Sequence, residues 1–526
     1  MSGLIHNMEE RYVGYLQDES RMQGSAEKIA FPRDVEEIRQ VLDLCRDNRM
    51  PVTLQGARTG IAGAAVPAGG LVLNLSKLNR ITGVRQEGEL FFLEAEPGVL
   101  LSDLKETLAS GRFDTDGWTD ASKEALANMQ KKGSLRFAPD PTETTATVGG
   151  MFASNAKGLS GYRFGRMSDH TEQVTLMLSD KTLWRVRRGE YRADDTGCRL
   201  PDGSLLPVLC RAGRDGIQSP EREAAASGYP LTMQPGQDLM DLLAGSEGML
   251  GIVVSLELRL IESPAECWGI LFFFADQRMA AEFAGLAGTI PGDARVTAAE
   301  FFDRVSLDVA EQMKSRMTSL KAIPDIPRDR AAAVYIELEA DSEEHAEGFL
   351  LELLDLFGAC GGEEADTWAA SGLREMEKFR LFRHAVPEGI NNCVDEIRRI
   401  LPGFVKMGAD FGGTGMELNK QIEYYSRDAQ KAGVRAVIFG HALERRFHVN
   451  LLPETEEEKK KADELMEQWA DAKAAEGVSL AAENGIGKVK AALVKERLSE
   501  GLMENMRAVK DHFDRDRILN RGNMGL

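Results

Sequence analysis

The sequence predicts a protein of mixed helices and strands that is divided into two or more domains. Its 526 residues exceed what a single hydrophobic core usually organises. Hydrophobic residues make up 43% of the chain and charged residues 28%, which is the composition of an ordinary globular protein. The longest apolar runs are far shorter than the roughly 18 residues that a membrane helix needs. We therefore expect no membrane insertion.

The net charge and the cysteine spacing argue against two classes of protein, those that bind nucleic acid and those that carry an iron–sulfur cluster. A formal net charge of −20 argues against nucleic acid as a partner, because phosphate binding needs clustered lysine and arginine. The six cysteines include no C-x-x-C pair, so we expect no iron–sulfur cluster in this chain. The N-terminus lacks the basic-then-apolar layout of a secretory signal, and we expect a cytoplasmic protein.

The elements of the first half are expected between residues 28 and 262, after a separate helical segment at 1–27. An amphipathic helix follows Asp34, whose side chain can cap its first turn. Short β-branched and aromatic runs predict strands at 52–55, 71–75 and 90–95. The polar region 187–237 is only weakly periodic, and we expect it to be an excursion from this domain.

The second half is expected to form another unit at residues 263–478. Its strand-like segments lie at 268–275, 334–339 and 434–439. Helical patterns separate them, and a charged helix begins near residue 454. The remaining segment, 479–526, is expected to be largely helical. Strands and helices that alternate in this way are compatible with an α+β class but do not establish it alone.

Three glycine-rich segments indicate where a large anionic ligand could bind: residues 55–63, 137–158 and 245–252. In the first, Gly56, Gly60 and Gly63 leave backbone amides uncovered, so a diphosphate could approach them closely. Their spacing, G-x-x-x-G-x-x-G, is neither the Rossmann fingerprint nor a Walker motif. The alternative is that the glycines serve tight turns only.

In their order along the chain, these segments resemble the FAD domain of the vanillyl-alcohol-oxidase/p-cresol-methylhydroxylase (PCMH) flavoprotein superfamily. The branch that looks closest contains glycolate oxidase and the D-lactate and D-2-hydroxyglutarate dehydrogenases. The resemblance runs from near residue 30 to the C-terminus. It implies an α+β fold with a two-part PCMH-type FAD-binding domain at 28–262. A cap domain with an antiparallel sheet would follow at 263–478, and 479–526 would return to the FAD site.

The resemblance implies bound FAD and assigns residues to it. We expect the FAD to be non-covalent, because no histidine or cysteine stands where relatives carry a covalent flavin link. Arg58 departs from the family, which usually has a small residue there. The implied cofactor-binding residues are Gln55, Gly56, Ala57, Arg58, Thr59, Gly60, Pro139, Thr147, Gly149, Gly150, Ser154, Asn155, Glu247, Gly248 and Ile252.

Two histidines follow the strand expected at 434–439. By resemblance, His441, His448 and Glu483 are the ligands of a divalent metal such as zinc in metal-using relatives. Two departures stand against this assignment. Asn484 occupies the position of the family's catalytic base, and an amide cannot take a proton at neutral pH. Residues 443–446 bring two arginines between the histidines, which disfavours a dication. Two histidines hydrogen-bonded in a polar pocket are the alternative.

A substrate carboxylate needs a fixed cation, and arginine supplies a bidentate one. Arg383 and Lys406 stand at positions that resemble the family's substrate-binding arginine and lysine, and Arg445 or Arg446 could add a second contact. The leading hypothesis is an FAD-dependent dehydrogenase that oxidises a D-2-hydroxy acid to the 2-oxo acid by hydride transfer to flavin. With Asn484 at the usual base position, His448 or His441 would act as the base.

Electrons would then pass to a protein partner, an iron–sulfur subunit or an electron-transfer flavoprotein. Two other readings of the atypical site stay open. The chain could be a flavin-binding relay or structural subunit without 2-hydroxy-acid chemistry. It could also be a different-substrate enzyme on the same scaffold, such as the redox-neutral ether-lipid synthases.

Overall fold

The computed structural model describes residues 3–207, 229, 231–323, 325–413 and 415–526. Contacts divide the chain into two compact units. The first unit contains Met1–Lys157, Phe164–Ser263 and Glu483–Leu526, and the second contains Gly158–Arg163 and Pro264–Ala482. Part of the excursion expected at 187–237 lies outside the described residues. No helix among the described residues is both long and apolar enough to cross a membrane.

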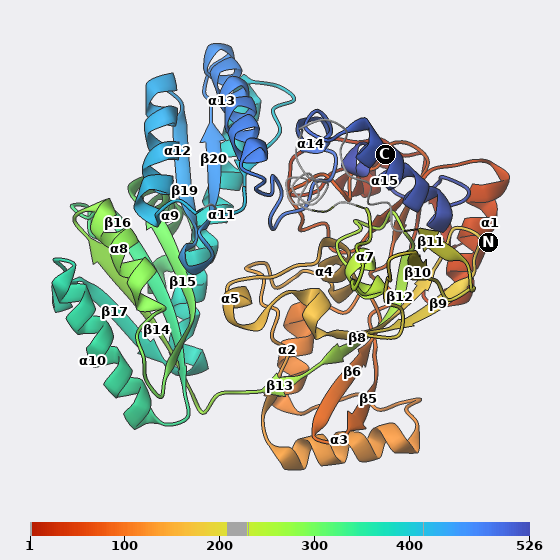
Figure 1. Cartoon of the computed structure of the whole chain (residues 1–526), viewed down its shortest axis with the longest axis horizontal. Coiled ribbons are helices and arrows are strands. Elements are labelled where there is room, and N and C mark those ends of the chain that lie inside the picture. Colours follow the sequence, from red (N-terminus) through yellow and green to blue (C-terminus); the bar gives the residue numbers. More distant parts are fainter. Residues whose placement is uncertain (1–2, 208–228, 230, 324, 414) are drawn as a thin grey trace. The chain divides into compact units, whose positions relative to one another are not determined.

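Two sheets build the first unit (Figure 1). In the smaller sheet, β1 is antiparallel to β2, and β2, β4 and β3 run parallel to one another. The larger sheet is antiparallel, in the order β5-β6-β12-β8-β9. The strands of the two sheets are β1 (Ile5–Asn7), β2 (Lys28–Ala30), β3 (Val52–Gln55), β4 (Leu71–Asn74), β5 (Ile81–Glu87), β6 (Leu90–Ala95), β8 (Thr171–Met177), β9 (Leu183–Arg187) and β12 (Ile252–Arg259).

Two further strand pairs and a set of helices complete this unit. The pairs are β7 (Leu135–Arg136) with β13 (Ile261–Glu262), and β10 (Gly197–Arg199) with β11 (Leu205–Pro207). The helices are α1 (Val35–Asp47), α2 (Leu101–Ser110), α3 (Asp120–Lys132), α4 (Val148–Ser154), α7 (Leu239–Leu243), α14 (Ala491–Lys495) and α15 (Glu500–Phe513).

Helix α1 shows how the local sequence sets an element. Asp34 has an extended backbone, and its side chain accepts a hydrogen bond from the amide of Glu37, as an N-cap does. The predicted apolar stripe of this helix, including Ile38 and Leu42, is fully buried against Leu71 and Leu73 of β4. The capped helix and the strand predicted at 71–75 are therefore confirmed.

The N-terminal prediction is wrong in its element type. The residues expected as a helical segment form strand β1 and a 3-10 helix at Glu10–Leu16. Strand β1 pairs antiparallel with β2 at the edge of the smaller sheet, from Ile5 opposite Ala30 to Asn7 opposite Lys28. The C-terminus ends in the same unit, where the amide of Val52 donates to Ile518 O at 2.7 Å.

The second unit is one antiparallel sheet of seven strands in the order β17-β14-β16-β15-β19-β20-β18. Its strands are β14 (Glu266–Phe274), β15 (Arg295–Asp303), β16 (Ala332–Ala340), β17 (Thr367–Ser371), β18 (Met407–Ala409), β19 (Arg435–His441) and β20 (Arg446–Leu452). The helices are α8 (Gln277–Ala287), α9 (Arg304–Arg316), α10 (Glu343–Ala359), α11 (Gly372–Ile400), α12 (Leu418–Ala432) and α13 (Glu456–Ala475). Helix α5 (Gly161–Phe164) begins in this unit's short segment.

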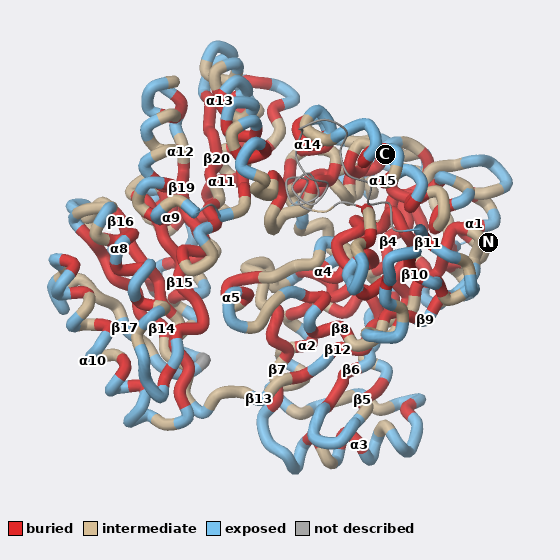
Figure 2. Tube along the Cα trace, viewed as in Figure 1, coloured by how far each residue is buried: buried red, intermediate tan, exposed pale blue. Residues whose placement is uncertain are grey.

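Alternation along β14 separates the two faces of this sheet. Phe272 and Phe274 pack against Phe283 of α8 and Phe357 of α10. Phe273 points the other way, into a core that also holds Phe382 of α11. The central strands are buried on both faces, as Figure 2 shows. The α+β class and the antiparallel cap sheet are confirmed.

Candidate functional site

The structure brings the three glycine-rich segments together around helix α4 of the first unit. A Cβ on Gly56 would lie 2.1 Å from Oγ1 of Thr147, so the first and second segments are in close contact. The amides of Gly245 and Glu247 donate to the last carbonyls of α4, at 2.9 and 2.8 Å. Segments that lie far apart in the sequence therefore line one region of a single unit.

In the first loop, residues 55–65, the backbone carbonyl oxygens and the backbone amides differ in their hydrogen bonding. Carbonyl oxygens throughout the loop accept hydrogen bonds, namely those of Gly56, Arg58, Ala62, Gly63, Ala64 and Ala65. The backbone amides of residues 57–63 have no acceptor within the described part of the chain. A run of unengaged N–H groups is a binding surface for an anion, because each amide carries partial positive charge. The loop is thus polarised to receive a group such as a diphosphate.

Glycines serve two purposes in this region. One leaves space beside the first loop, and another allows close packing of helix α4. Around Gly60, a Cβ would meet no atom within 4 Å, so the loop borders free space there. In contrast, a Cβ on Gly149 would lie 2.5 Å from Cβ and 2.9 Å from the carbonyl oxygen of Pro97. Thr147 caps α4, and its Oγ1 accepts the amide of Gly150 at 3.2 Å. These contacts pack the start of α4 tightly against Pro97.

Glu247, predicted as a cofactor residue, holds the C-terminal segment. Its buried carboxylate accepts the amide of Ile486 at 2.7 Å and that of Gly487 at 2.8 Å. Burial raises the pKa of this carboxyl group, and these hydrogen bonds oppose the shift. Nδ2 of Asn520 donates to the Glu247 carbonyl at 2.5 Å. Asn520 is not among the predicted site residues, although it lies in the segment 479–526 that is expected to return to the FAD site.

The other predicted cofactor residues of the three segments take varied positions. Ile252 is fully buried in the core against β4, so its side chain is a packing residue. The hydroxyl of Ser154 donates back into its own helix, to the Gly150 carbonyl at 3.0 Å. Asn155 ends α4 with a left-handed backbone (φ 48°), and its Oδ1 accepts the amide of Ser168 at 2.9 Å. Pro139 is buried.

Gln55 and Arg58 connect the first loop to the N-terminal segment. Nε2 of Gln55 donates to the carbonyls of Tyr15 and Ala65 at 2.8 and 2.7 Å. Its buried Oε1 has no hydrogen-bond partner among the described residues. Arg58 has a left-handed backbone (φ 63°), and its guanidinium lies 4.2 Å from the ring centroid of Tyr15. The charge therefore stacks on an aromatic ring. Ala57, Thr59 and Gly60 complete the loop.

In the second unit, Arg383 lies in a buried charge cluster on α11. Its Nε donates to Glu300 of β15 at 2.5 Å, and both side chains are almost fully buried. Burial alone would lower the pKa of Arg383, but the nearby carboxylates of Glu300 and Glu337 raise it overall. Nη2 of Arg383 is buried and has no hydrogen-bond partner among the described residues. No sequence signal had singled out Glu300, because it joins Arg383 only through the fold.

The two other predicted substrate residues differ from each other. Lys406 is buried, and its Nζ donates to Oδ1 of Asn391 at 2.8 Å. Arg445 is exposed and has a left-handed backbone (φ 52°), with a 3.5 Å contact to the Met416 carbonyl. Its neighbour Arg446 is the buried cation, in an ion pair with Glu444. Of the two arginines that the sequence offered for a second contact, the structure buries Arg446 and exposes Arg445.

The two histidines lie on neighbouring strands of the cap sheet. His441 ends β19 and His448 lies in β20, with ring centroids 5.8 Å apart. Glu483 follows Ala482, the last residue of the second unit, and one ligand atom from each of the three residues lies within 4.8 Å of the others. Groups of this kind are common without an ion, so the metal remains a prediction. Asn484 comes next in the chain.

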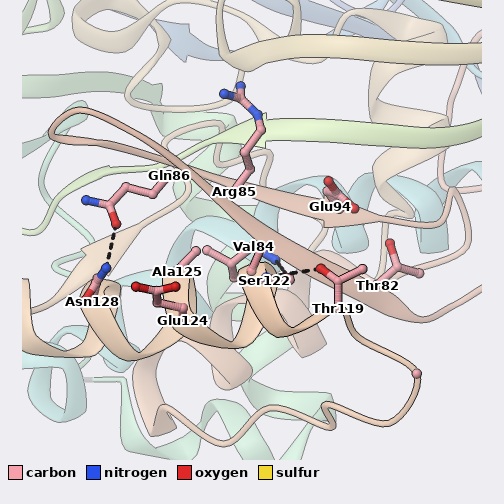
Figure 3. A pocket seen from close by; sticks show the side chains of 12 residues that line it. Thr82, Val84, Arg85, Gln86, Glu94, Thr119, Ser122, Glu124, Ala125 and Asn128 are labelled. Carbon is pink, nitrogen blue, oxygen red and sulfur yellow. Dashed lines mark hydrogen bonds between the residues drawn. The ribbon is translucent and has the colours of Figure 1, made fainter.

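A polar groove lies elsewhere in the first unit, between β5 and α3 (Figure 3). Its volume is about 440 Å³. Arg85, Glu94, Ser122 and Asn128 are among its lining side chains, and none of the predicted site residues lines it. Most of these side chains are at least partly exposed, so the groove is shallow. It does not coincide with the candidate cofactor site.

Two family profiles match the chain. Residues 26–117 match the FAD binding domain, and residues 271–524 match the C-terminal domain of FAD linked oxidases. A D-lactate dehydrogenase from Anaerostipes hadrus is 26% identical over 97% of this chain and 92% of its own length. Glycolate oxidase subunit GlcD of Bacillus subtilis (strain 168) is 23% identical over 95% of this chain and 89% of its own.

Comparison with solved structures shows that the chain shares its fold with known proteins. The structure of p-cresol methylhydroxylase with substrate bound has a TM-score of 0.64 at 16% identity, covering 100% of this chain and 94% of that one. An alkyldihydroxyacetonephosphate synthase has a TM-score of 0.59 at 13% identity, covering 98% and 82%. The chain is an FAD-linked oxidoreductase: residues 26–117 resemble the FAD binding domain, and residues 271–524 resemble the C-terminal domain of FAD linked oxidases.

Proposed function

We propose that this protein is an FAD-dependent dehydrogenase that oxidises a D-2-hydroxy acid to the corresponding 2-oxo acid. The buried Nη2 of Arg383, which has no hydrogen-bond partner among the described residues, carries the proposal. A buried guanidinium donor without an acceptor is costly, and a carboxylate oxygen is the acceptor that matches it best. The names of the relatives from Anaerostipes and Bacillus support a small hydroxy acid as the bearer of that carboxylate.

The residues of the second unit would divide the chemistry among them. Arg383 and Lys406 would bind the substrate carboxylate, and Arg445 would assist from its exposed turn. His448 or His441 would take the hydroxyl proton, since Asn484 has no basic site. When bound, FAD accepts the α-hydrogen as hydride. The substrate thus loses a proton and a hydride, and its carbinol carbon becomes a carbonyl.

The FAD is proposed to be non-covalent and held by the amides of residues 57–63, with Thr147, Gly149 and Gly150 lining the neighbouring segment. In the alternative arrangement, His441, His448 and Glu483 would hold a zinc or similar ion, which would lower the pKa of the substrate hydroxyl group in place of a histidine base. Reoxidation would use a protein partner, an iron–sulfur subunit or an electron-transfer flavoprotein. A cytoplasmic location fits such a partner.

The test is an anaerobic absorbance titration of the FAD-loaded protein with paired D- and L-2-hydroxy acids. We expect one D-acid to bleach the flavin band while its L-enantiomer leaves the band unchanged. The His448→Ala variant should lose rapid reduction by that acid. His345→Ala is the matched control, because this exposed histidine lies on α10 of the same unit.

Three results would contradict the proposal, the third of them only its electron-accepting partner. A flavin that every acid leaves oxidised, but that dithionite reduces, would favour a relay subunit. Product formation without any electron acceptor would favour a redox-neutral enzyme on this scaffold. Rapid and stoichiometric hydrogen peroxide formation by the protein alone would exclude the need for a partner protein.

A further inference from the structure

The C-terminal segment of the first unit binds the carbonyl side of the cofactor loop. The amides of Lys488 and Val489 both donate to the carbonyl of Ala62 at 3.0 Å. Nδ2 of Asn523 donates to the carbonyl of Ala64 at 3.1 Å. Nζ of Lys488 lies 3.4 Å from the carbonyl oxygen of Gly63, a residue 425 positions earlier in the chain. These contacts hold the carbonyls on one side of the loop, where they cannot face an anion.

The Lys488 side chain also brings a buried positive charge to the loop. Its second acceptor is Oδ1 of Asn523 at 2.5 Å, and no third acceptor is found for its ammonium group in the described part of the chain. Burial lowers the pKa of Lys488 to about 8, while the carboxylates of Glu247 and Asp18 act in the opposite direction. Asp18 is itself buried, and its Oδ2 has no hydrogen-bond partner among the described residues.

We propose that Lys488 is a positioning residue of the cofactor loop, which turns the Gly63 carbonyl away from the ligand and balances the charge of the FAD diphosphate. The inference rests on FAD binding by the loop amides, as in the proposed function. It assigns a role to a residue outside the three glycine-rich segments. The diphosphate carries two negative charges, and a cation beside the amide run reduces the cost of gathering them in a partly buried site.

The experiment compares FAD affinity of the apoprotein between Lys488→Met and Lys488→Arg, by quenching of flavin fluorescence. Lys495→Met is the matched control, because it removes one exposed lysine from the same C-terminal segment. We expect the Met variant to bind FAD about 10- to 100-fold more weakly, the range for a lost charge-assisted hydrogen bond. The Arg variant should stay within about threefold of the wild type, and the control should match it.

The pH profile separates a charge role from a merely structural one. Wild-type affinity for FAD should fall as the pH rises from 7 to 9.5, because Lys488 loses its proton there, whereas the Met variant should show a flat profile. The titratable groups that face Lys488 are the carboxyl groups of Glu247 and Asp18. Circular dichroism of the apoproteins checks that the variants fold.

Several results would overturn the inference. These are wild-type FAD affinity in the Met variant, an Arg variant as weak as the Met variant, and a wild-type affinity that is constant from pH 7 to 9.5. The last measurement stands even if the Met variant does not fold. All titrations lack substrate, so failure of every hydroxy acid to reduce the flavin would refute the proposed function and leave this result untouched.

Discussion

Removing either member of the buried pair Arg383 and Glu300 should lower the free energy of unfolding, and the two losses should differ in size. Removing one member of a buried ion pair costs about 3–5 kcal/mol, because the other charge is left uncompensated. Glu300→Gln leaves Arg383 beside Glu337, so we expect the lower end, about 3 kcal/mol. Arg383→Met leaves Glu300 and Glu337 as two carboxylates without their cation, so we expect about 5 kcal/mol.

The double variant should be less destabilised than the sum of the single variants, by about 2 kcal/mol or more. Urea unfolding followed by tryptophan fluorescence measures each free energy, since Trp368 packs in the same core as Arg383's neighbour Phe382. The exposed pair of Lys459 and Asp463 is the control, and Asp463→Asn should change stability by less than about 0.5 kcal/mol. Strict additivity, or single variants within about 1 kcal/mol of the wild type, would refute the reasoning.

Three further predictions concern stability. Burial raises the pKa of Asp303 from 3.8 to about 6. Between about pH 4 and 6 the folded state therefore holds a proton on Asp303 that the unfolded state has lost. Stability should therefore fall by about 3 kcal/mol as the pH rises from about 4 to 6, and Asp303→Ser should lack this slope in urea titrations. Gly149→Ala should lower stability by about 1–3 kcal/mol through its clash with Pro97, while Gly150→Ala, which meets only Thr147 Oγ1 at 3.0 Å, should be nearly neutral in thermal unfolding. Arg58→Gly should be more stable than Arg58→Ala by about 1 kcal/mol, because only glycine relieves the left-handed backbone; equal melting temperatures would contradict this.

Much of the fold could be predicted because it depends on neighbouring residues. The cap of α1 is a contact between Asp34 and Glu37, and the strand at 52–55 is a short run of β-forming residues. Such local patterns indicate both the type of an element, through its hydrophobic period, and the residue at which it begins or ends. The N-terminal segment was predicted wrongly because its pairing with β2 depends on a strand more than twenty residues away.

The parts of the site that escaped prediction are long-range pairs. Glu300 contacts Arg383 across 83 positions of sequence, and Glu247 accepts the amide of Ile486 across 239. Neither partner belongs to a motif that announces the other, since buried charges are paired by the tertiary fold and not by local spacing. The sequence could not choose between Arg445 and Arg446, because two adjacent residues on a turn differ in burial only once the strand register is known.

The attachment of the cofactor loop to the end of the chain has a consequence for biosynthesis. The loop's carbonyls are held by Lys488 and Asn523, so this network cannot close while those residues are still inside the ribosome. Contacts that span most of a chain form late, after the local elements have folded. Flavin capture should therefore wait until residues 488 and 523 have left the ribosome, and a nascent chain stalled before residue 488 should fold its strands without retaining FAD.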